Sequence, residues 1–164
     1  MRDFKDVADR LLKSYSTYYN INTDTPAEPF FAEASFKAHN EHYFLTKKAM
    51  LSEYDQKEFV FFARVAALDE KTLKELDERA WQEGLSRAEI KENHRSTDVV
   101  LIILADSFDE NILRAVKKTK HSKSYRFGFY GYSNYKLVAY ELSTGRTCFN
   151  RLGKDLRKLF GSNA

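Results

Sequence analysis

Cysteine, proline and glycine are scarce in this chain of 164 residues, which contains 1 Cys, 2 Pro and 6 Gly. The single cysteine, Cys148, excludes a disulfide within the chain and a cluster of cysteines around a metal ion. Few glycines and prolines predict short connections between regular elements. The longest apolar stretch, Val99 to Ala105, is far shorter than the roughly 20 residues of a membrane-spanning helix.

We expect no secretory signal, because the residues Met1 to Asp6 are mostly charged and lack the apolar stretch of such a signal. This absence and the missing disulfides predict a cytoplasmic protein that does not enter a membrane. Hydrophobic residues make up 43% of the chain and charged residues 31%, which excludes a disordered protein. We therefore expect one folded domain over residues 1–164.

The first half of the chain changes from helical to strand periodicity. Apolar residues at helical spacing predict a helix over 3–19, and a loop rich in Asn, Thr, Asp and Pro follows over 20–29. Alternation with a period of two predicts a strand over 30–38. Two further strands, over 43–51 and 58–66, would complete a set of three antiparallel strands.

The second half begins with a helix that Asp69 caps and Gly84 ends, followed by a short helix at the capping box of Ser86 and Glu89. The apolar run Val99 to Ala105 predicts a central strand over 98–105. Further elements are a helix over 109–120, a hairpin of strands 125–132 and 135–142 around Ser133-Asn134, a strand over 147–149 and a helix over 152–160. The order α-βββ-α-β-α-βββ-α predicts an α+β fold, with one mixed or antiparallel sheet packed against helices.

Charge is distributed unevenly along the chain. Residues 1–110 hold 15 Lys and Arg against 22 Asp and Glu, whereas residues 111–164 hold 12 against 2. Basic clusters bind nucleic acid or other polyanions by releasing counterions, and Tyr125, Tyr130, Tyr132 and Tyr135 are candidates for stacking on bases. The candidate polyanion-binding residues are Arg114, Lys117, Lys118, Lys120, Lys123, Arg126, Arg151 and Lys154. Alternatively, these charges only solvate helix faces, because sequence halves need not be spatial halves.

No segment carries a catalytic or cofactor signature. Gly128 and Gly131 fit a twisted or bulged strand better than a phosphate loop, and Cys148 fits a small buried hydrophobe. His39 and His42, with Glu41 between them, are better explained by a surface turn than by a metal site. We therefore predict no catalytic residue, no metal ligands and no cofactor.

The order of residues 3–105, α-βββ-α-β, resembles the core of the restriction-endonuclease-like nucleases. This resemblance implies carboxylates that hold a divalent metal ion beside the scissile phosphate. The acid-x-Lys motif of that family would fall on Asp55-Gln56-Lys57, and Glu33 and Glu41 would supply further carboxylates. The alternative interpretation is an exposed polar hairpin tip.

The end of the chain, with Leu142-Ser143-Thr144-Gly145-Arg146 and Asn150-Arg151-Leu152-Gly153-Lys154, resembles the strand–turn–strand–helix close of small uncharacterised bacterial proteins. That resemblance implies a domain of unknown function and names no activity. Our first hypothesis is a noncatalytic domain that binds a protein partner or forms a homodimer through its aromatic-rich final hairpin. Polyanion binding and a metal-dependent nuclease are the alternatives.

Overall fold

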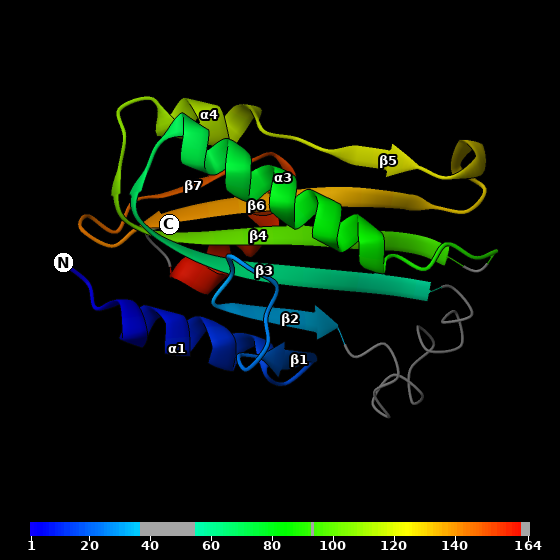
Figure 1. The fold of residues 1–164 in the computed structure, drawn as a ribbon, viewed down its shortest axis with the longest axis horizontal. Helices are drawn as coiled ribbons and strands as arrows, with labels where there is room; N and C mark the ends of the chain where they lie inside the picture. The colour runs from blue at the N-terminus through cyan, green and yellow to red at the C-terminus, as the bar shows by residue number, and fades with distance from the viewer. Residues whose placement is uncertain (37–54, 93, 162–164) are drawn as a thin grey trace.

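A computed structural model describes residues 1–36, 55–92 and 94–161 (Figure 1). They form one mixed sheet of seven strands with helices on both faces, which confirms the predicted α+β fold. The strand order is β1-β2-β3-β4-β6-β5, and β7 also pairs with β6. The predicted strand over 43–51 lies outside the described residues, as do His39, Glu41 and His42.

The N-terminal part supplies one helix and one edge of the sheet. Helix α1 (Phe4–Tyr15) begins where the Asp3 carboxylate accepts a hydrogen bond from the Asp6 N–H at 3.0 Å. Strand β1 (Tyr19–Asn22) pairs antiparallel with β2 (Ala32–Phe36). The predicted loop over 20–29 is therefore wrong at its start. The reason is that Tyr19 and Ile21 pack against the core and draw this segment into the sheet.

Three long parallel strands form the middle of the sheet: β3 (Asp55–Leu68), β4 (His94–Phe108) and β6 (Tyr132–Glu141). Strand β2 pairs directly with β3 and runs antiparallel to it. The predicted hairpin succession of three strands is wrong here, because it would run the strands over 30–38 and 58–66 in the same direction. Strand β4 lies between β3 and β6, and its residues 99–105 are all buried, which confirms the predicted central strand. Helices α3 (Glu70–Arg87) and α4 (Ile112–Lys118) connect these strands on one side of the sheet (Figure 1).

Helix α3 begins as predicted but does not end at Gly84. The Asp69 carboxylate caps it by accepting a hydrogen bond from the Thr72 N–H at 2.7 Å. The helix continues to Arg87, so the predicted second helix is wrong. Gly84 is a packing position, because a Cβ atom there would lie 2.4 Å from the Val99 side chain. Absence of a side chain thus lets α3 approach β4 closely.

The predicted hairpin around Ser133-Asn134 is also wrong, because both residues lie inside β6. Strand β5 (Ser122–Ser124) pairs with β6 instead, and residues 125–131 form the turn, which includes the 3₁₀ helix η2 (Arg126–Gly128). Gly128 and Gly131 have φ angles of 90° and 82°, which an extended strand cannot hold. The alternating aromatic residues therefore imitate a strand without forming one.

The last elements match the prediction. Strand β7 (Thr147–Phe149) pairs antiparallel with the end of β6, and η3 (Leu152–Phe160) follows as a 3₁₀ helix. Strands β5 and β7 pair with the same strand at different ends, because β5 faces residues 132–134 and β7 faces residues 138–140.

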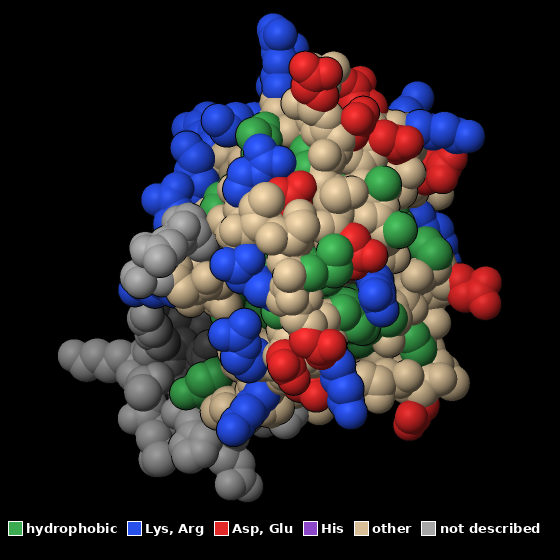
Figure 2. All heavy atoms as spheres, turned by 90° about the vertical axis from the view of Figure 1, so that its left-hand side faces the viewer, with side chains coloured by type: hydrophobic (Ala, Val, Ile, Leu, Met, Phe, Trp, Pro, Cys, Tyr) green, Lys and Arg blue, Asp and Glu red, His purple; other side chains and the backbone are tan. Residues whose placement is uncertain are grey.

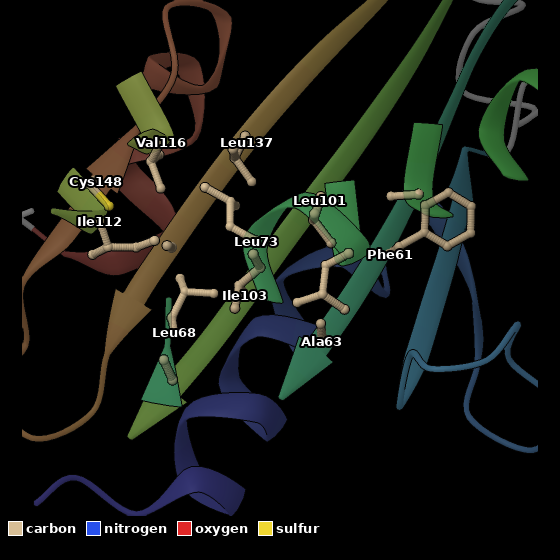
Figure 3. Packing of buried hydrophobic residues seen from close by; sticks show 14 of the residues in the cluster. Phe61, Ala63, Leu68, Leu73, Leu101, Ile103, Ile112, Val116, Leu137 and Cys148 are labelled. Carbon is tan, nitrogen blue, oxygen red and sulfur yellow. The ribbon is translucent and has the colours of Figure 1, made fainter. Parts of the chain in front are cut away.

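Two apolar layers lie on opposite faces of the sheet. In the first, Phe61, Leu101 and Leu137 pack with Leu73 of α3 (Figure 3). Cys148 lies in the same layer, beside α4 (Figure 3). The second layer joins α1 and η3 to alternate residues of the strands: Val60, Phe62, Val100, Ile102, Leu104 and Tyr140. This second face carries the candidate site.

Candidate functional site

A groove lies between α1 and η3 on the second face of the sheet. Its volume is about 410 Å³, and we call it the α1–η3 groove. Its lining is mainly apolar, and α1 contributes three polar side chains, those of Arg10, Lys13 and Ser14. The other lining residues are Val7, Leu11, Tyr140, Leu159, Phe160 and Gly161. Mostly apolar hollows with a few polar groups are the usual form of small-ligand sites.

A second hollow of about 560 Å³ lies along η3, and we call it the η3 hollow. It is lined by Lys154, Asp155, Arg157, Lys158 and Gly161. Gly161 lines both hollows, so they adjoin at the end of η3. Counted together, the two hollows present five cationic side chains and one carboxylate.

The cations of the two hollows are available to a ligand. Arg10, Lys13, Lys154, Arg157 and Lys158 are all exposed, and within the described residues none of them forms a side-chain ion pair. Figure 2 shows Lys and Arg side chains without acidic neighbours along the upper left margin of one end of the molecule, whereas at the upper right the two signs of charge are mixed. That margin is the side where η3 lies behind the sheet in Figure 1.

Local sequence explains why these side chains point outward together. In α1, Arg10, Lys13 and Ser14 are three and four residues apart, a spacing that puts them on one side of the helix. In η3, the apolar residues Leu156, Leu159 and Phe160 pack on the core. This leaves the basic residues between them in solvent.

Beneath this surface, polar side chains interrupt the apolar face, and we call Glu58, Asp98 and Lys136 the polar row. Glu58 of β3 pairs in register with Asp98 of β4. Lys136 of β6 lies 3.6 Å from Asp98 and 3.6 Å from Asp155 of η3. Since Asp155 also lines the η3 hollow, the polar row reaches the surface there.

Glu58 has a perturbed acidity. Burial raises the pKa of its carboxyl, and the nearby Asp98 adds to this, whereas Tyr19 and Lys136 act to lower it. The Tyr19 hydroxyl donates a hydrogen bond to Glu58. Burial and Glu58 also raise the pKa of Tyr15, whose hydroxyl has no hydrogen-bond partner among the described residues. Both acids of the polar row are therefore held by a neighbour, Glu58 by Tyr19 and Asp98 by Lys136.

The predicted polyanion-binding residues are exposed but lie in different places. Arg114, Lys117 and Lys118 belong to α4, on the opposite side of the sheet from η3. Lys123 lies over the Tyr125 ring at 5.5 Å and Arg126 over the Tyr130 ring at 4.8 Å, near the turn between β5 and β6. Lys120 precedes β5, and Arg151 precedes η3.

Only Lys154 of the predicted set lines one of the two hollows. The list of binding residues predicted from the sequence left out Arg157 and Lys158, although both belong with Lys154 to the basic last helix. It also missed Arg10 and Lys13, because they belong to the part of the chain with an excess of acids.

The turn between β5 and β6 presents aromatic rings to solvent, and we call residues 125–131 the aromatic turn. Phe127 is 100% exposed and Phe129 is 82% exposed. Backbone hydrogen bonds fix this turn, including Tyr125 N–H to Gly131 O at 3.0 Å. Among the tyrosines proposed to stack on bases, Tyr132 just beyond the turn is exposed, whereas Tyr135 is buried.

The carboxylates of the nuclease hypothesis do not meet in the described residues. Arg87 donates to both oxygens of Glu33, each at 3.0 Å. Although burial acts to raise it, the pKa of Glu33 is lowered by hydrogen bonds from Arg87, Ala27 and Asn22. Asp55 is the first residue of β3, and Glu41 lies outside the described residues. In the part of the chain that is described, no three His, Cys, Asp or Glu side chains are placed to hold a metal ion.

The side chains of His94 and Cys148 are both buried in the fold. The His94 ring contacts the Tyr130 carbonyl at 2.5 Å and the Thr97 hydroxyl at 2.8 Å, and it is buried. Burial raises the pKa of the Cys148 thiol to about 12, despite lowering contributions from nearby groups. A thiol with this pKa is almost entirely protonated at neutral pH, so it is a poor nucleophile.

Comparison with known proteins gives a family but no activity. No curated protein and no solved structure matches the chain. None of the helices in the described ranges is long and apolar enough to cross a bilayer. The model of one family, described as Domain of unknown function (DUF8052), matches residues 3–162. The match extends well beyond the last third of the chain, to which the sequence resemblance was confined, and the protein belongs to this family.

Proposed function

We propose that this domain is a noncatalytic binding module for nucleic acid or a similar polyanion. The observation that supports this proposal best is the lining of the two adjoining hollows. Arg10 and Lys13 of α1 and three cations of η3 line them, against a single acid, Asp155. Cations arranged along a groove bind a phosphate backbone by releasing counterions.

The unpaired state of these cations supports the same proposal. An exposed cation that already forms an ion pair must give up its partner before it binds a phosphate. The cations of the two hollows form no such ion pair within the described ranges. Asp155, the one acid of the two linings, lies within ion-pair distance of Lys136 instead. A polyanion can therefore bind without breaking an existing ion pair.

A nuclease at the polar row is less well supported than simple binding. A catalytic metal ion needs free carboxylate oxygens. Glu58 accepts a hydrogen bond from Tyr19, and Asp98 lies beside Lys136. The acids nearest to the proposed binding surface are thus engaged within the protein.

Charge reversal on the two sides of the sheet tests the proposal. We expect the protein to bind a fluorescent oligonucleotide in low salt, with affinity that falls as salt is added. The double substitution Lys154→Glu and Arg157→Glu should weaken binding by about tenfold or more, because it replaces two attractive charges by repulsive ones. Fluorescence polarisation measures this change.

The matched control is Lys117→Glu with Lys118→Glu, which makes the same change in net charge on α4. We expect this variant to bind at most a few-fold more weakly than the wild type. Equal loss in both double variants would indicate a general effect of net charge and would contradict a specific surface. Lack of binding to any oligonucleotide in low salt would also contradict the proposal.

Self-association through the aromatic turn is a second candidate, and it corresponds to our first hypothesis from the sequence. It is favoured by Phe127 and Phe129, which expose their rings on a turn with a fixed backbone. Strand β5 beside the turn is an edge strand, whose residues are all exposed. Exposed rings next to an open strand edge are typical of contact surfaces.

Light scattering over a range of concentrations tests this second candidate. We expect the wild type to show a dimer at high concentration, and Phe127→Ser with Phe129→Ser to shift it to the monomer because the apolar contact is lost. The control is Leu152→Ser, which removes an exposed apolar side chain elsewhere. A strict monomer at every concentration would exclude self-association.

A further inference from the structure

We infer that the α1–η3 groove accepts an unpaired base of a single-stranded nucleic acid, while the cations around it hold the phosphates. This inference rests on the proposed polyanion binding and specifies its substrate class. A ligand that consists of phosphates alone requires only cations in its binding site. The groove offers cations together with a mainly apolar lining, in a total volume of about 410 Å³.

The walls of the groove suit a flat ring. Phe160 stacks on Tyr140 with ring centroids 5.4 Å apart and an angle of 25° between the rings. Both residues line the groove, and Leu11 and Leu159 also contribute to its lining. A ring that is already held by stacking is a rigid platform for a further aromatic group, and protein rings bind bases of single strands in this way.

The charges around the groove favour a chain of phosphates over a single acid with an apolar tail. Arg10 and Lys13 line the groove itself, whereas Lys154, Arg157 and Lys158 line the adjoining η3 hollow. A ligand with a single carboxylate would contact the cations of one hollow only. A strand that runs past the end of η3 at Gly161 would use both sets.

A double helix fits this arrangement less well than a single strand. In a duplex, the bases are stacked and paired, so a base must first leave the stack before it can enter a protein groove. Single strands present their bases without that cost. We therefore expect the protein to prefer single-stranded over double-stranded nucleic acid of equal length.

The test compares three polyanions on the intact chain by fluorescence polarisation and competition. The probes are oligo(dT) of about ten nucleotides, a duplex of the same length and inorganic polyphosphate of the same chain length. We expect oligo(dT) to bind about tenfold more tightly than polyphosphate, since each stacked base contributes measurably to affinity. The substitution Phe160→Leu, which keeps an apolar side chain but removes the ring, should abolish this advantage.

The control for the ring is Phe129→Leu, the same substitution on the aromatic turn, which should leave the preference unchanged. Unchanged binding of polyphosphate to Phe160→Leu would show that the variant is folded and keeps its cationic surface. Equal affinity of wild type for oligo(dT) and polyphosphate would overturn the base site while leaving polyanion binding intact. Failure of all three probes to bind would remove the polyanion proposal itself. Displacement of oligo(dT) by decanoate at low concentration would also overturn the inference, in favour of an amphipathic acid.

Discussion

Replacing Asn150 by alanine is expected to lower the free energy of unfolding by about 3 kcal/mol. Its side-chain oxygen accepts hydrogen bonds from Leu137 N–H at 2.9 Å and Gly153 N–H at 2.8 Å. Its amide nitrogen donates to the carbonyls of Thr119 and Tyr135, each at 3.1 Å. Asn150 is only 2% exposed, so alanine would leave several backbone groups without partners and largely shielded from water.

Urea unfolding followed by the fluorescence of Trp81, the single tryptophan, measures this change. The matched control is Asn20→Ala, because Asn20 is exposed on the edge strand β1 and should change the stability by less than about 0.5 kcal/mol. A loss below about 1 kcal/mol for Asn150→Ala would mean that the four hydrogen bonds contribute less than their geometry indicates.

The substitution Lys136→Met is expected to cost about 2 kcal/mol at neutral pH, and more as the pH rises. Lys136 lies within ion-pair distance of both Asp98 and Asp155, and its positive charge also lowers the pKa of Glu58. Methionine fills similar space but leaves these acids without their cation. Thermal unfolding at several pH values measures the effect.

The direction of the pH dependence follows from Glu58. Burial raises its pKa in the folded state above the ordinary value of 4.5, so the folded protein holds this proton more tightly than the unfolded chain. Its stabilising contribution is present at low pH and is lost as the pH rises from about 4.5 through the folded pKa. Without Lys136 that pKa rises further, which extends the loss to higher pH.

Glu58→Gln separates this effect from simple packing. Glutamine keeps an oxygen that can accept the hydrogen bond from Tyr19 but carries no charge. In the Lys136→Met background, it should recover part of the lost stability at pH 8 and little at pH 5. If the cost of Lys136→Met is the same at both pH values, the acids of the polar row do not cause it.

Much of the fold was predictable because local patterns agree with the tertiary structure. The uninterrupted apolar run 99–105 indicated a strand covered on both faces, and β4 is that strand. Asp69 indicated a helix start, and its carboxylate caps α3. In these segments, the same residues that set the local conformation also bury the core.

The errors arise where one residue type serves two purposes. Gly84 resembles a helix end, but its missing side chain makes room for Val99 of a strand. Gly128 and Gly131 lie between aromatic residues at strand spacing, but their positive φ angles form a turn. Only the packing partner or the backbone angle distinguishes the two cases, and neither is visible in the sequence.

The basic character of the candidate site could be predicted from the sequence, but the positions of its residues on the fold could be predicted only in part. An excess of cations after residue 110 pointed to polyanion binding, and Lys154 lies in the η3 hollow. Lys117 and Lys118 have the same local charge density but lie on the other side of the sheet. Arg10 and Lys13 join the site because α1 and η3 pack on the same face of the sheet, a long-range arrangement that periodicity cannot reveal.

Both crossover helices, α3 and α4, cover the same face of the sheet, so the other face depends on elements from distant parts of the chain. While the ribosome extends the nascent chain, α1 has emerged early, but Tyr140 of β6 lacks its stacking partner Phe160 until η3 follows β7. The α1–η3 groove therefore forms only after residues 152–161 have been synthesised. A nascent chain without these residues would possess most of the sheet and none of the groove.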